Sequence, residues 1–375
     1  AVPDGGLVVM TIPPNPYRCP PGPYERASLM AWWLQKHRPK AKLLLLDSKD
    51  RFTKDALFKA AWEARYPNLE WQGLSAGARL RRVDGKTGLI ETDFDRFSPD
   101  LANVIPPQRA PALLRRAGLD GGQGWCPIEP TAFESPLAKD VHILGDAAIA
   151  NPMPKSAFAA NSQGKACAAA LIADALERVR DVLNANESML GDLDAVAGDG
   201  DHGAGMARGS TAAAQAAREL VAEGAGTQTT LAGAGARWTE HSGGASGALW
   251  GAALTAAGNS LGDDRDVDNA AVVAAVQAFV DSVINLGKAN VGDKTIVDAL
   301  VPFTEAFATA VASTGDVSQA WQTAAAASEE AAAGTEALVP RMGRARVLGE
   351  RSVGSPDPGA VSFAMAAKAA GVATD

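Results

Sequence analysis

The kinds of residue change abruptly along this chain, so that no single fold class suits both of its halves. All three tyrosines and five of the eight tryptophans precede position 130, as do most of the prolines. Beyond position 175 the sequence is rich in alanine and glycine and shows long helical patterns of apolar residues. A chain of 375 residues is long enough for about two domains. We therefore predict an α/β domain at 1–172 and an all-α domain at 175–375.

The composition argues against several classes of protein. With 47% hydrophobic and 21% charged residues, the chain suits a soluble globular protein. A net charge of −8 argues against nucleic acid as the main partner. The cysteines, Cys19, Cys126 and Cys167, are odd in number and widely spaced, which fits neither a disulfide framework nor a zinc site. We find no apolar run of transmembrane length and no signal-peptide pattern, so we expect a cytoplasmic protein without a membrane partner. Whether it forms a homo-oligomer stays open.

Three carboxylates lie close together in the middle of the chain, where one helical run ends and another begins. Asp194, Asp199 and Asp201 fall within eight residues, and glycines beside the last two allow sharp turns. Like charges packed so closely repel one another unless protons or a cation neutralise them. Oxygen ligands on a short flexible loop suit Mg²⁺, which keeps coordination positions for water and phosphate oxygens. The alternative is an acidic turn that only connects two helices.

The first half of the chain begins with a strand–helix–strand pattern. We predict a buried strand at 6–12, a helix at 24–36 and a second strand at 42–47 that ends in an aspartate. This is the outline of a dinucleotide-binding half-domain. Its glycine fingerprint is missing, because the loop after the first strand reads Pro-Pro-Asn-Pro-Tyr. Further along we predict a strand at 141–147 and a helix from 156 to 176.

Four runs in this half carry a resemblance to a known family. They are MTIPPNPYRCPPGPYERASL (10–29), NVIPPQRA (103–110), GWCP (124–127) and VHILGDAAIANPMPKSAFAANSQGKAC (141–167). Together they resemble the flavoprotein subunit of flavocytochrome c sulfide dehydrogenase, over roughly residues 1–172. The resemblance implies the two-dinucleotide-fold architecture of FAD-dependent disulfide reductase relatives. It also implies that Gly145 and Asp146 contact the FAD ribityl chain and phosphates, and that Cys19 is one half of a redox-active pair beside the flavin.

The sequence also departs from that family. We do not find the FAD-binding unit with its glycine-rich phosphate loop and flavin-linking cysteine, nor the segment that carries the partner cysteine. Asp146 by itself does not hold a dinucleotide, because the pyrophosphate needs a helix N-terminus and a close-approach glycine loop. FAD is therefore the less favoured cofactor, and the alternative for Cys19 is an unpaired thiol in a loop.

The second half reads as helices joined by polar turns, and strand patterns are missing from it. The helices form an all-α bundle of about eight. One of them begins at the glycine-rich turn 241–251, and the other predicted ranges are 175–191, 206–223, 230–240, 269–286, 296–312, 318–333 and 360–370. Between them lie the acidic turn, a glycine-rich turn at 241–251, a polar turn at 287–295 and a basic turn at 343–354. Carboxylates for a metal, and amides and arginine for phosphate, are the ingredients of a Mg²⁺–polyphosphate site. For the glycine-rich turn, the alternative is close packing of two helices.

Four runs across these turns carry a second resemblance. They are LDAVAGDGDHGAGM (193–206), GGASGALWG (243–251), GKANVGDKTIVDALVPF (287–303) and GRARVLGERSVGSPDPGA (343–360). They resemble the nucleotide-binding (L) domain of dihydroxyacetone kinases, over residues 175–375. The resemblance implies a barrel of eight antiparallel helices with the nucleotide bound at one end. It further implies that Asp194, Asp199 and Asp201 hold two Mg²⁺ ions, which bridge the phosphates of ATP or ADP.

The same resemblance assigns the remaining nucleotide contacts, position by position. The first loop after the aspartates contributes His202, Gly203, Ala204 and Gly205. Ala245 and Ser246 match positions at the phosphates, whereas Gly287 and Ile296 match positions at the base and ribose. The site is closed by Arg344 together with the turn of Asp357, Pro358 and Gly359. Arg344 and the three aspartates are then the catalytic residues.

These assignments predict a domain that works with a partner. Phosphoryl transfer needs positioning and charge neutralisation more than covalent help from the protein. In the family a separate K domain holds dihydroxyacetone through a histidine. None of the four histidines here, His37, His142, His202 and His241, matches that residue. We predict a Mg-ATP/ADP-binding phosphotransferase domain of a dihydroxyacetone kinase, which delivers phosphate to dihydroxyacetone held by a K-domain protein.

Two other interpretations stay open. One is a fragment of an FAD-dependent sulfide:cytochrome c oxidoreductase. The other is a nucleotide-binding module without catalytic activity, whose first half is a structural appendage. Because the expected neighbours of both halves, the FAD-binding unit and the K domain, are not found in the sequence, we interpret the chain as a gene fusion or an assembly of two incomplete reading frames.

Overall fold

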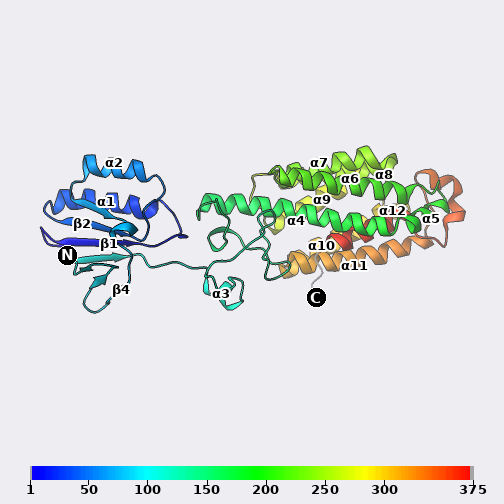
Figure 1. Ribbon diagram of the computed structural model, residues 1–375. Helices are drawn as coiled ribbons and strands as arrows, with labels where there is room; N and C mark the ends of the chain where they lie inside the picture. The colour runs from blue at the N-terminus through cyan, green and yellow to red at the C-terminus, as the bar shows by residue number, and fades with distance from the viewer. Residues whose placement is uncertain (1, 372–375) are drawn as a thin grey trace. The chain divides into compact units, whose positions relative to one another are not determined.

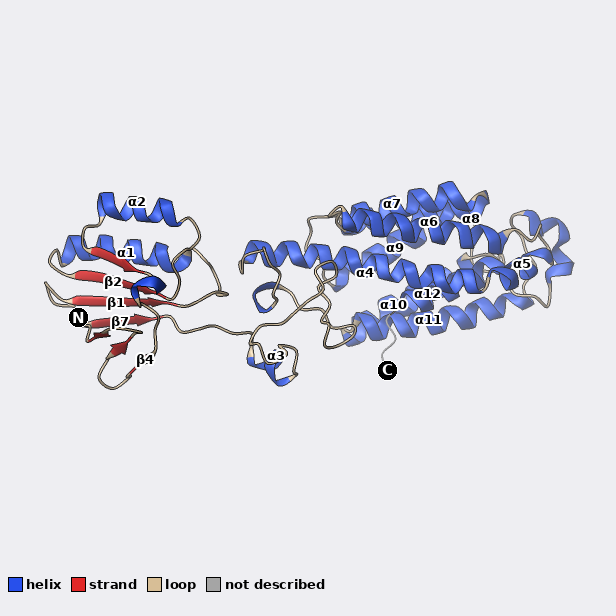
Figure 2. Cartoon of the chain, viewed as in Figure 1, coloured by secondary structure: helices blue, strands red, loops and turns tan. Residues whose placement is uncertain are grey.

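The computed structural model describes residues 2–371 apart from the side chains of Arg344 and Leu348. It consists of two compact units, Ala1–Gly164 and Lys165–Asp375, and the boundary between them falls inside one long helix, α4 (Ala157–Ala185). Figure 1 follows the chain by colour from end to end, and Figure 2 shows strands in the first unit and helices throughout the second. The chain is thus largely helical, with a small parallel sheet in its first unit.

A four-stranded parallel sheet forms the centre of the first unit. Its strand order is β3-β2-β1-β7, and the strands are β1 (Leu7–Ile12), β2 (Lys42–Asp47), β3 (Leu69–Gln72) and β7 (Leu101–Val104). In the register, Val9 pairs with Leu44 on one side and with Ala102 on the other. The two inner strands are apolar along most of their length because both faces of the sheet are covered.

Different elements cover the two faces of this sheet. Helices α1 (Gly22–His37) and α2 (Asp55–Arg65) lie on one face, as Figure 2 shows. There the side chains of Tyr24 and Trp62 pack against Met10 and other strand residues. The opposite face carries a three-stranded antiparallel sheet, whose strands are β4 (Arg82–Val83), β5 (Ile90–Glu91) and β6 (Arg96–Phe97). The unit therefore contains a small parallel sheet that is covered by two helices on one face and by a short antiparallel sheet on the other.

The aspartate that ends β2 is enclosed in a network of hydrogen bonds. Asp47 is 0% exposed, and its Oδ1 accepts a hydrogen bond from Lys49 Nζ at 2.7 Å. Its Oδ2 accepts from the Tyr24 hydroxyl at 2.8 Å and from the Trp71 indole N–H at 3.2 Å. Burial lowers the pKa of Lys49, and the nearby carboxylate of Asp47 opposes that shift. Breaking a buried pair by removing one partner costs about 3–5 kcal/mol.

The segment between β7 and α4 is mostly irregular. It contains the short helix α3 (Ala112–Arg116) and a 3₁₀ turn at Gly145–Ala147. The strand predicted at 141–147 is wrong, because only an isolated bridge joins His142 to Glu134 there. Ile143 instead packs in a small cluster with Trp125 and Cys126. Its apolar pattern therefore reflects local burial rather than membership of a sheet.

The second unit is a bundle of long helices. After α4 they are α5 (Glu187–Ala195), α6 (His202–Ala222), α7 (Thr227–Ser242), α8 (Gly244–Leu261), α9 (Asn269–Gly287), α10 (Val297–Thr314), α11 (Val317–Gly334) and α12 (Pro358–Ala370). Short 3₁₀ segments follow α11 at Thr335–Ala337 and Arg344–Ser352. The predicted boundary between the helices 156–176 and 175–191 is wrong, because the first helix runs unbroken to Ala185. No proline or glycine interrupts the sequence between 165 and 190, and the break comes at Asn186.

Small residues let these helices approach one another closely. A Cβ atom added at Gly235 of α7 would lie 2.5 Å from the carbonyl oxygen of Gly251 on α8, closer than real contacts allow. Beside this contact, the rings of Trp238 and Trp250 stack with their centroids 4.7 Å apart. Both rings lie in the apolar core, which they share with Phe307. The alanine and glycine content of this half therefore reflects close packing of its helices.

One helix corrects an expectation about membranes. By length and composition, α9 (Asn269–Gly287) is apolar enough to cross a membrane, whereas we expected no such run. Its apolar residues Val280 and Val283 are buried in the core of the bundle. Its polar residues Gln277 and Asp281 are exposed. This division between two faces is typical of a helix at the edge of a packed bundle.

Candidate functional site

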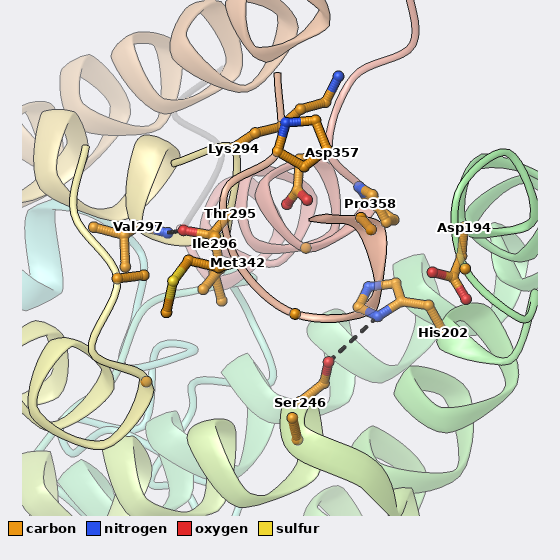
Figure 3. A pocket seen from close by; sticks show the side chains of 18 of the residues that line it. Asp194, His202, Ser246, Lys294, Thr295, Ile296, Val297, Met342, Asp357 and Pro358 are labelled. Atoms are coloured by element: carbon orange, nitrogen blue, oxygen red, sulfur yellow. Dashed lines mark hydrogen bonds between the residues drawn. The ribbon is translucent and has the colours of Figure 1, made fainter. Parts of the chain in front are cut away.

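A cavity of about 520 Å³ opens where several helix ends of the second unit meet. It is bounded by the end of α5, the first turns of α6 and α8, the turn 287–297 and the segment 340–359. Pockets of this volume hold ligands of nucleotide size. Figure 3 shows Asp194, His202 and Ser246 toward one end of the cavity, and Ile296, Val297 and Met342 toward the other.

The predicted acid cluster forms the polar end of the site. One carboxylate oxygen each from Asp194, Asp199 and Asp201 can be chosen so that all three lie within 4.8 Å of one another. Asp194 sits on the last turn of α5, and Asp201 is the residue before α6 begins. The backbone N–H of Gly200 donates to Asp194 Oδ2 at 2.9 Å, which fixes the loop that carries the other two acids. The structure therefore brings together the three residues that we predicted as metal ligands.

The chemistry of this donor set fits a divalent cation. Three oxygen ligands on one side leave coordination positions for water and phosphate oxygens, as Mg²⁺ requires. Asp194 is half-buried and lines the cavity, whereas Asp199 and Asp201 are exposed and lie beside it, so the cluster faces solvent next to the cavity. Carboxylates this close repel one another when no cation is present.

His202 connects three helices beside the acids. Its Nε2 lies 3.0 Å from Ser362 Oγ on α12, and its Nδ1 lies 3.5 Å from Ser246 Oγ on α8. Ser362 Oγ also donates to the carbonyl of Gly359, so it is free to accept a hydrogen bond from the imidazole. Burial lowers the pKa of His202, although the charge of Asp194 opposes this shift. The side chain thus links α6 to α12 and α8 beside the acids.

The start of α8 supplies backbone donors to the cavity wall. The helix begins at Gly244, and Ala245 and Ser246 of its first turn line the cavity. The first N–H groups of a helix have no partner inside it and favour anions. The first turn of α6, which holds Gly203, Ala204 and Gly205, offers a similar helix start beside the acids.

Apolar side chains form the opposite end of the cavity. Gly287 and Ile296 line it, and their contacts with a base and ribose stay predictions. Sequence reasoning missed most of this wall, namely Leu249, Val283, Leu286, Val297, Pro340 and Met342. Each of them belongs to an apolar pattern that a packed helix or loop explains equally well. Nothing in the local sequence distinguishes a cavity wall from a core.

The turn before α12 closes the site from a third side. Asp357, Pro358 and Gly359 all line the cavity. The side chain of Asp357 caps α12 by accepting from the N–H of Ala360 at 2.7 Å. Burial raises the pKa of Asp357 to about 7, and the cap hydrogen bond opposes the shift. The predicted contact of Arg344 falls on a side chain outside the described residues.

The residues predicted for a flavin lie in the first unit and are also brought near one another. Arg18 Nε lies 3.5 Å from a carboxylate oxygen of Asp146. The N–H of Cys19 donates to the Lys155 carbonyl at 2.9 Å, and Lys155 Nζ donates to the Asp146 carbonyl at 2.8 Å. The next residue back, Gly145, donates its N–H to a glutamine side chain of α4. Their predicted contacts with FAD stay predictions.

Asp357 gives a predicted pH dependence of stability. Its carboxyl ionises near 3.8 in the unfolded chain but near 7 in the folded one, so between these values the folded state holds the extra proton. Rising pH should therefore weaken folding, by about 1.4 kcal/mol for each pH unit at most. Asp357→Asn keeps an oxygen for the cap and removes the titration. We expect its free energy of unfolding, relative to wild type, to rise steadily across this interval.

Urea unfolding of the protein without metal or nucleotide, followed by helical circular dichroism, measures this difference. Asp268 makes the same cap hydrogen bond at α9, at 2.8 Å, but from an exposed position. Asp268→Asn is therefore the matched control, and it should not reproduce the pH-dependent difference. A constant difference between Asp357→Asn and wild type would contradict the assignment.

Comparison with known families gives two matches. A sequence model of the DAK2 domain matches residues 196–371. A model of the central part of the flavoprotein chain of flavocytochrome c sulfide dehydrogenase matches residues 1–106. The resemblance of residues 175–375 to dihydroxyacetone kinases is thereby confirmed, and the flavoprotein match covers residues 1–106 of the range 1–172 over which we drew the other resemblance.

Individual relatives agree with the first match. An L-erythrulose 1-kinase of Mycolicibacterium smegmatis is 50% identical over 212 residues, which are 56% of this chain and 37% of that protein. The ADP-binding subunit DhaL of a PEP-dependent dihydroxyacetone kinase from Listeria innocua is 34% identical, over 50% of this chain and 86% of the subunit. The Escherichia coli DhaL subunit is 33% identical, over 50% of this chain and 88% of the subunit. The chain spans less than half the length of the erythrulose kinases that it matches.

Proposed function

Because this chain belongs, through its DAK2 domain, to the dihydroxyacetone kinase family, we propose that residues 175–375 form a Mg²⁺-dependent phosphotransferase domain that binds ATP or ADP. The observation that carries the proposal is the position of the three clustered carboxylates next to a cavity of about 520 Å³. Two helix starts, at His202 and Gly244, border the same space. The carboxylates suit a metal, the helix starts suit a polyphosphate, and the apolar end of the cavity suits a base.

Each part of the site would bind a different part of the nucleotide complex. Asp194, Asp199 and Asp201 would hold Mg²⁺, which when bound offsets the negative charge of the phosphates. The amides at the starts of α6 and α8 fix the phosphates, with Arg344 as a further cationic partner. The apolar end takes the base and ribose, against Gly287 and Ile296. The protein thus orients the nucleotide and excludes water, which is most of what phosphoryl transfer requires.

The phosphoryl acceptor is dihydroxyacetone held by a separate K-domain protein. The names of the Listeria innocua and Escherichia coli relatives, ADP-binding subunits, support such a division of labour. We further propose that the bundle is the eight-helix barrel of this family and that the protein acts in the cytoplasm.

Titration calorimetry with ADP and ATP tests the proposal. We expect binding in the presence of Mg²⁺ and at least a tenfold weaker affinity in EDTA, since the phosphates then face uncompensated carboxylates. Phosphorylation of dihydroxyacetone after adding a K-domain protein would separate a phosphotransferase from a passive nucleotide-binding module. Absence of binding with Mg²⁺ present would refute the assignment.

The first unit has its own alternative, a fragment of an FAD-dependent sulfide:cytochrome c oxidoreductase. The observation that favours it is the match to residues 1–106, together with the parallel sheet found there. A bound flavin would make the purified protein yellow, with absorbance at about 450 nm. A colourless protein that gains no absorbance with added FAD would leave the kinase-type function as the one to pursue.

A further inference from the structure

A buried lysine lies at the base of the segment that closes the cavity. Lys294 belongs to the turn between α9 and α10 and is only 5% exposed. Its ammonium group donates to the Leu338 carbonyl at 3.1 Å and to the Ser352 carbonyl at 2.6 Å. These two carbonyls stand at either end of residues 339–351, which we call the strap. One side chain therefore joins both ends of the strap.

The strap forms one wall of the proposed nucleotide site. Pro340, Met342, Gly343 and Ala345 of the strap all line the cavity. Among the described residues, the Arg341 N–H also anchors the strap to the turn, because it donates to the Asp293 carbonyl at 3.1 Å. Lys294 therefore holds this wall at both of its ends.

The turn that carries Lys294 is itself held firmly. Asp298 accepts from the N–H groups of Gly292 at 2.6 Å and Thr295 at 2.7 Å. Asp293 accepts from the N–H of Asn290 at 2.8 Å. Lys294 has a φ of 60°, a left-handed conformation that costs free energy for any residue with a Cβ atom. The hydrogen bonds of Asp293 and Asp298 thus hold the backbone of the turn in this conformation, and with it the direction of the Lys294 side chain.

A lysine in a nucleotide site is usually expected to bind phosphate, but the ammonium group of Lys294 donates to backbone carbonyls instead. Its ammonium group is bound to two carbonyl oxygens, and the carboxylates that act on it are Asp357 and Glu336. In Figure 3 Lys294 and Asp194 lie on different sides of the cavity. Burial of a charged group is tolerated only when its hydrogen bonds are satisfied, and here two of its three donors have partners.

We propose that Lys294 is a positioning residue, which fastens both ends of the strap so that the strap forms a fixed wall against the nucleotide. For its effect on nucleotide affinity the proposal rests on the proposed function. Its effect on the strap itself does not, and can be measured without a ligand.

Limited digestion with trypsin measures how firmly the strap is held. The strap contains Arg341, Arg344, Arg346 and Arg351, so it offers the protease four sites once it opens. In Lys294→Met, which keeps the length of the side chain and loses both hydrogen bonds, we expect cleavage within the strap to be faster by about tenfold or more. Mass spectrometry locates the cuts. Lys288→Met is the matched control, because Lys288 lies on the same turn, has a φ of 56° and is exposed.

Nucleotide affinity provides the second measurement. We expect Lys294→Met to bind MgADP about tenfold more weakly than wild type, and MgADP to slow strap cleavage in wild type. If MgADP changes nothing in wild type, the proposed function fails, while the ligand-free comparison still decides the role of Lys294. Weaker binding with unchanged strap cleavage would indicate a phosphate ligand and would overturn the proposal.

Chemical rescue separates positioning from a general loss of folding. Lys294→Ala leaves space for propylammonium, which can restore the missing ammonium group. We expect added propylammonium, but not propanol, to return strap cleavage in Lys294→Ala to the wild-type rate. Failure of propylammonium to protect the strap in a variant with wild-type circular dichroism would overturn the proposal.

Discussion

Asp199→Asn will abolish Mg²⁺-dependent nucleotide binding while leaving the helical bundle folded. The substitution keeps the shape of the side chain and removes one of the three charges whose oxygens lie within 4.8 Å of one another. Removing an acidic ligand from a Mg²⁺ site should weaken nucleotide binding by about 100-fold or more, since even outer partners of metal ligands are worth 10- to 100-fold. Calorimetric titration with MgADP measures the loss.

The same variant should also differ from wild type in how its thermal stability responds to Mg²⁺ and ADP. Without a metal, the clustered carboxylates repel one another, and Asp199→Asn removes one of these charges. With Mg²⁺ and ADP added, wild type should gain thermal stability and the variant should not. Asp192→Asn, at an exposed acid on α5 outside the cluster, is the matched control and should behave as wild type. A variant that binds MgADP with unchanged affinity would refute the metal assignment.

Gly203→Ala should both destabilise the second unit and disrupt the acid cluster. Gly203 is where α6 crosses α5, and a Cβ atom there would overlap the carbonyl oxygen of Glu187 and lie 2.8 Å from the nitrogen of Gly191. Both are backbone atoms, so no side chain can move aside. We expect a loss of about 3 kcal/mol in the free energy of unfolding, the upper range for overpacking.

The loss should extend to metal binding, because α5 carries Asp194 and Asp201 directly precedes α6. Pushing the helices apart separates these ligands, so Mg²⁺-dependent binding should weaken even in the fraction that stays folded. Gly164→Ala in α4 is the control, since nothing lies within 4 Å of its added Cβ atom. It should be neutral or slightly stabilising, by about 0.5–1 kcal/mol, because alanine favours helix. Equal stability of Gly203→Ala and wild type would contradict the contact.

Sequence reasoning succeeded where the determining interactions are local. The helices of the second half follow from apolar spacing, and most of their predicted ends lie within a few residues of those in the structure. The acid cluster could be predicted because Asp194, Asp199 and Asp201 are close in sequence and glycines shape the loop between them. The paired strands β1 and β2 likewise follow from two continuous apolar runs.

What depends on distant segments could not be predicted. The strand expected at 141–147 lacks a partner along its length, and its sequence alone does not show that. Lys294 was placed only in a polar turn, because its two carbonyl partners are more than forty positions away, with separations of 44 and 58 residues. A buried lysine and an exposed one look alike in a sequence. Met342 and Val283 likewise become cavity wall only once three other segments surround them.

The enclosed carboxylate at the end of β2 limits what the first unit can recognise. In dinucleotide-binding folds an acid at the end of the second strand often takes the hydroxyls of the adenosine ribose in NADH. Here both oxygens of Asp47 are already occupied by Lys49, Tyr24 and Trp71, and none of its surface reaches solvent. A pyridine nucleotide would have to break this ion pair to enter. The carboxylate of Asp47 therefore stabilises the first unit from within and is not exposed to a ribose.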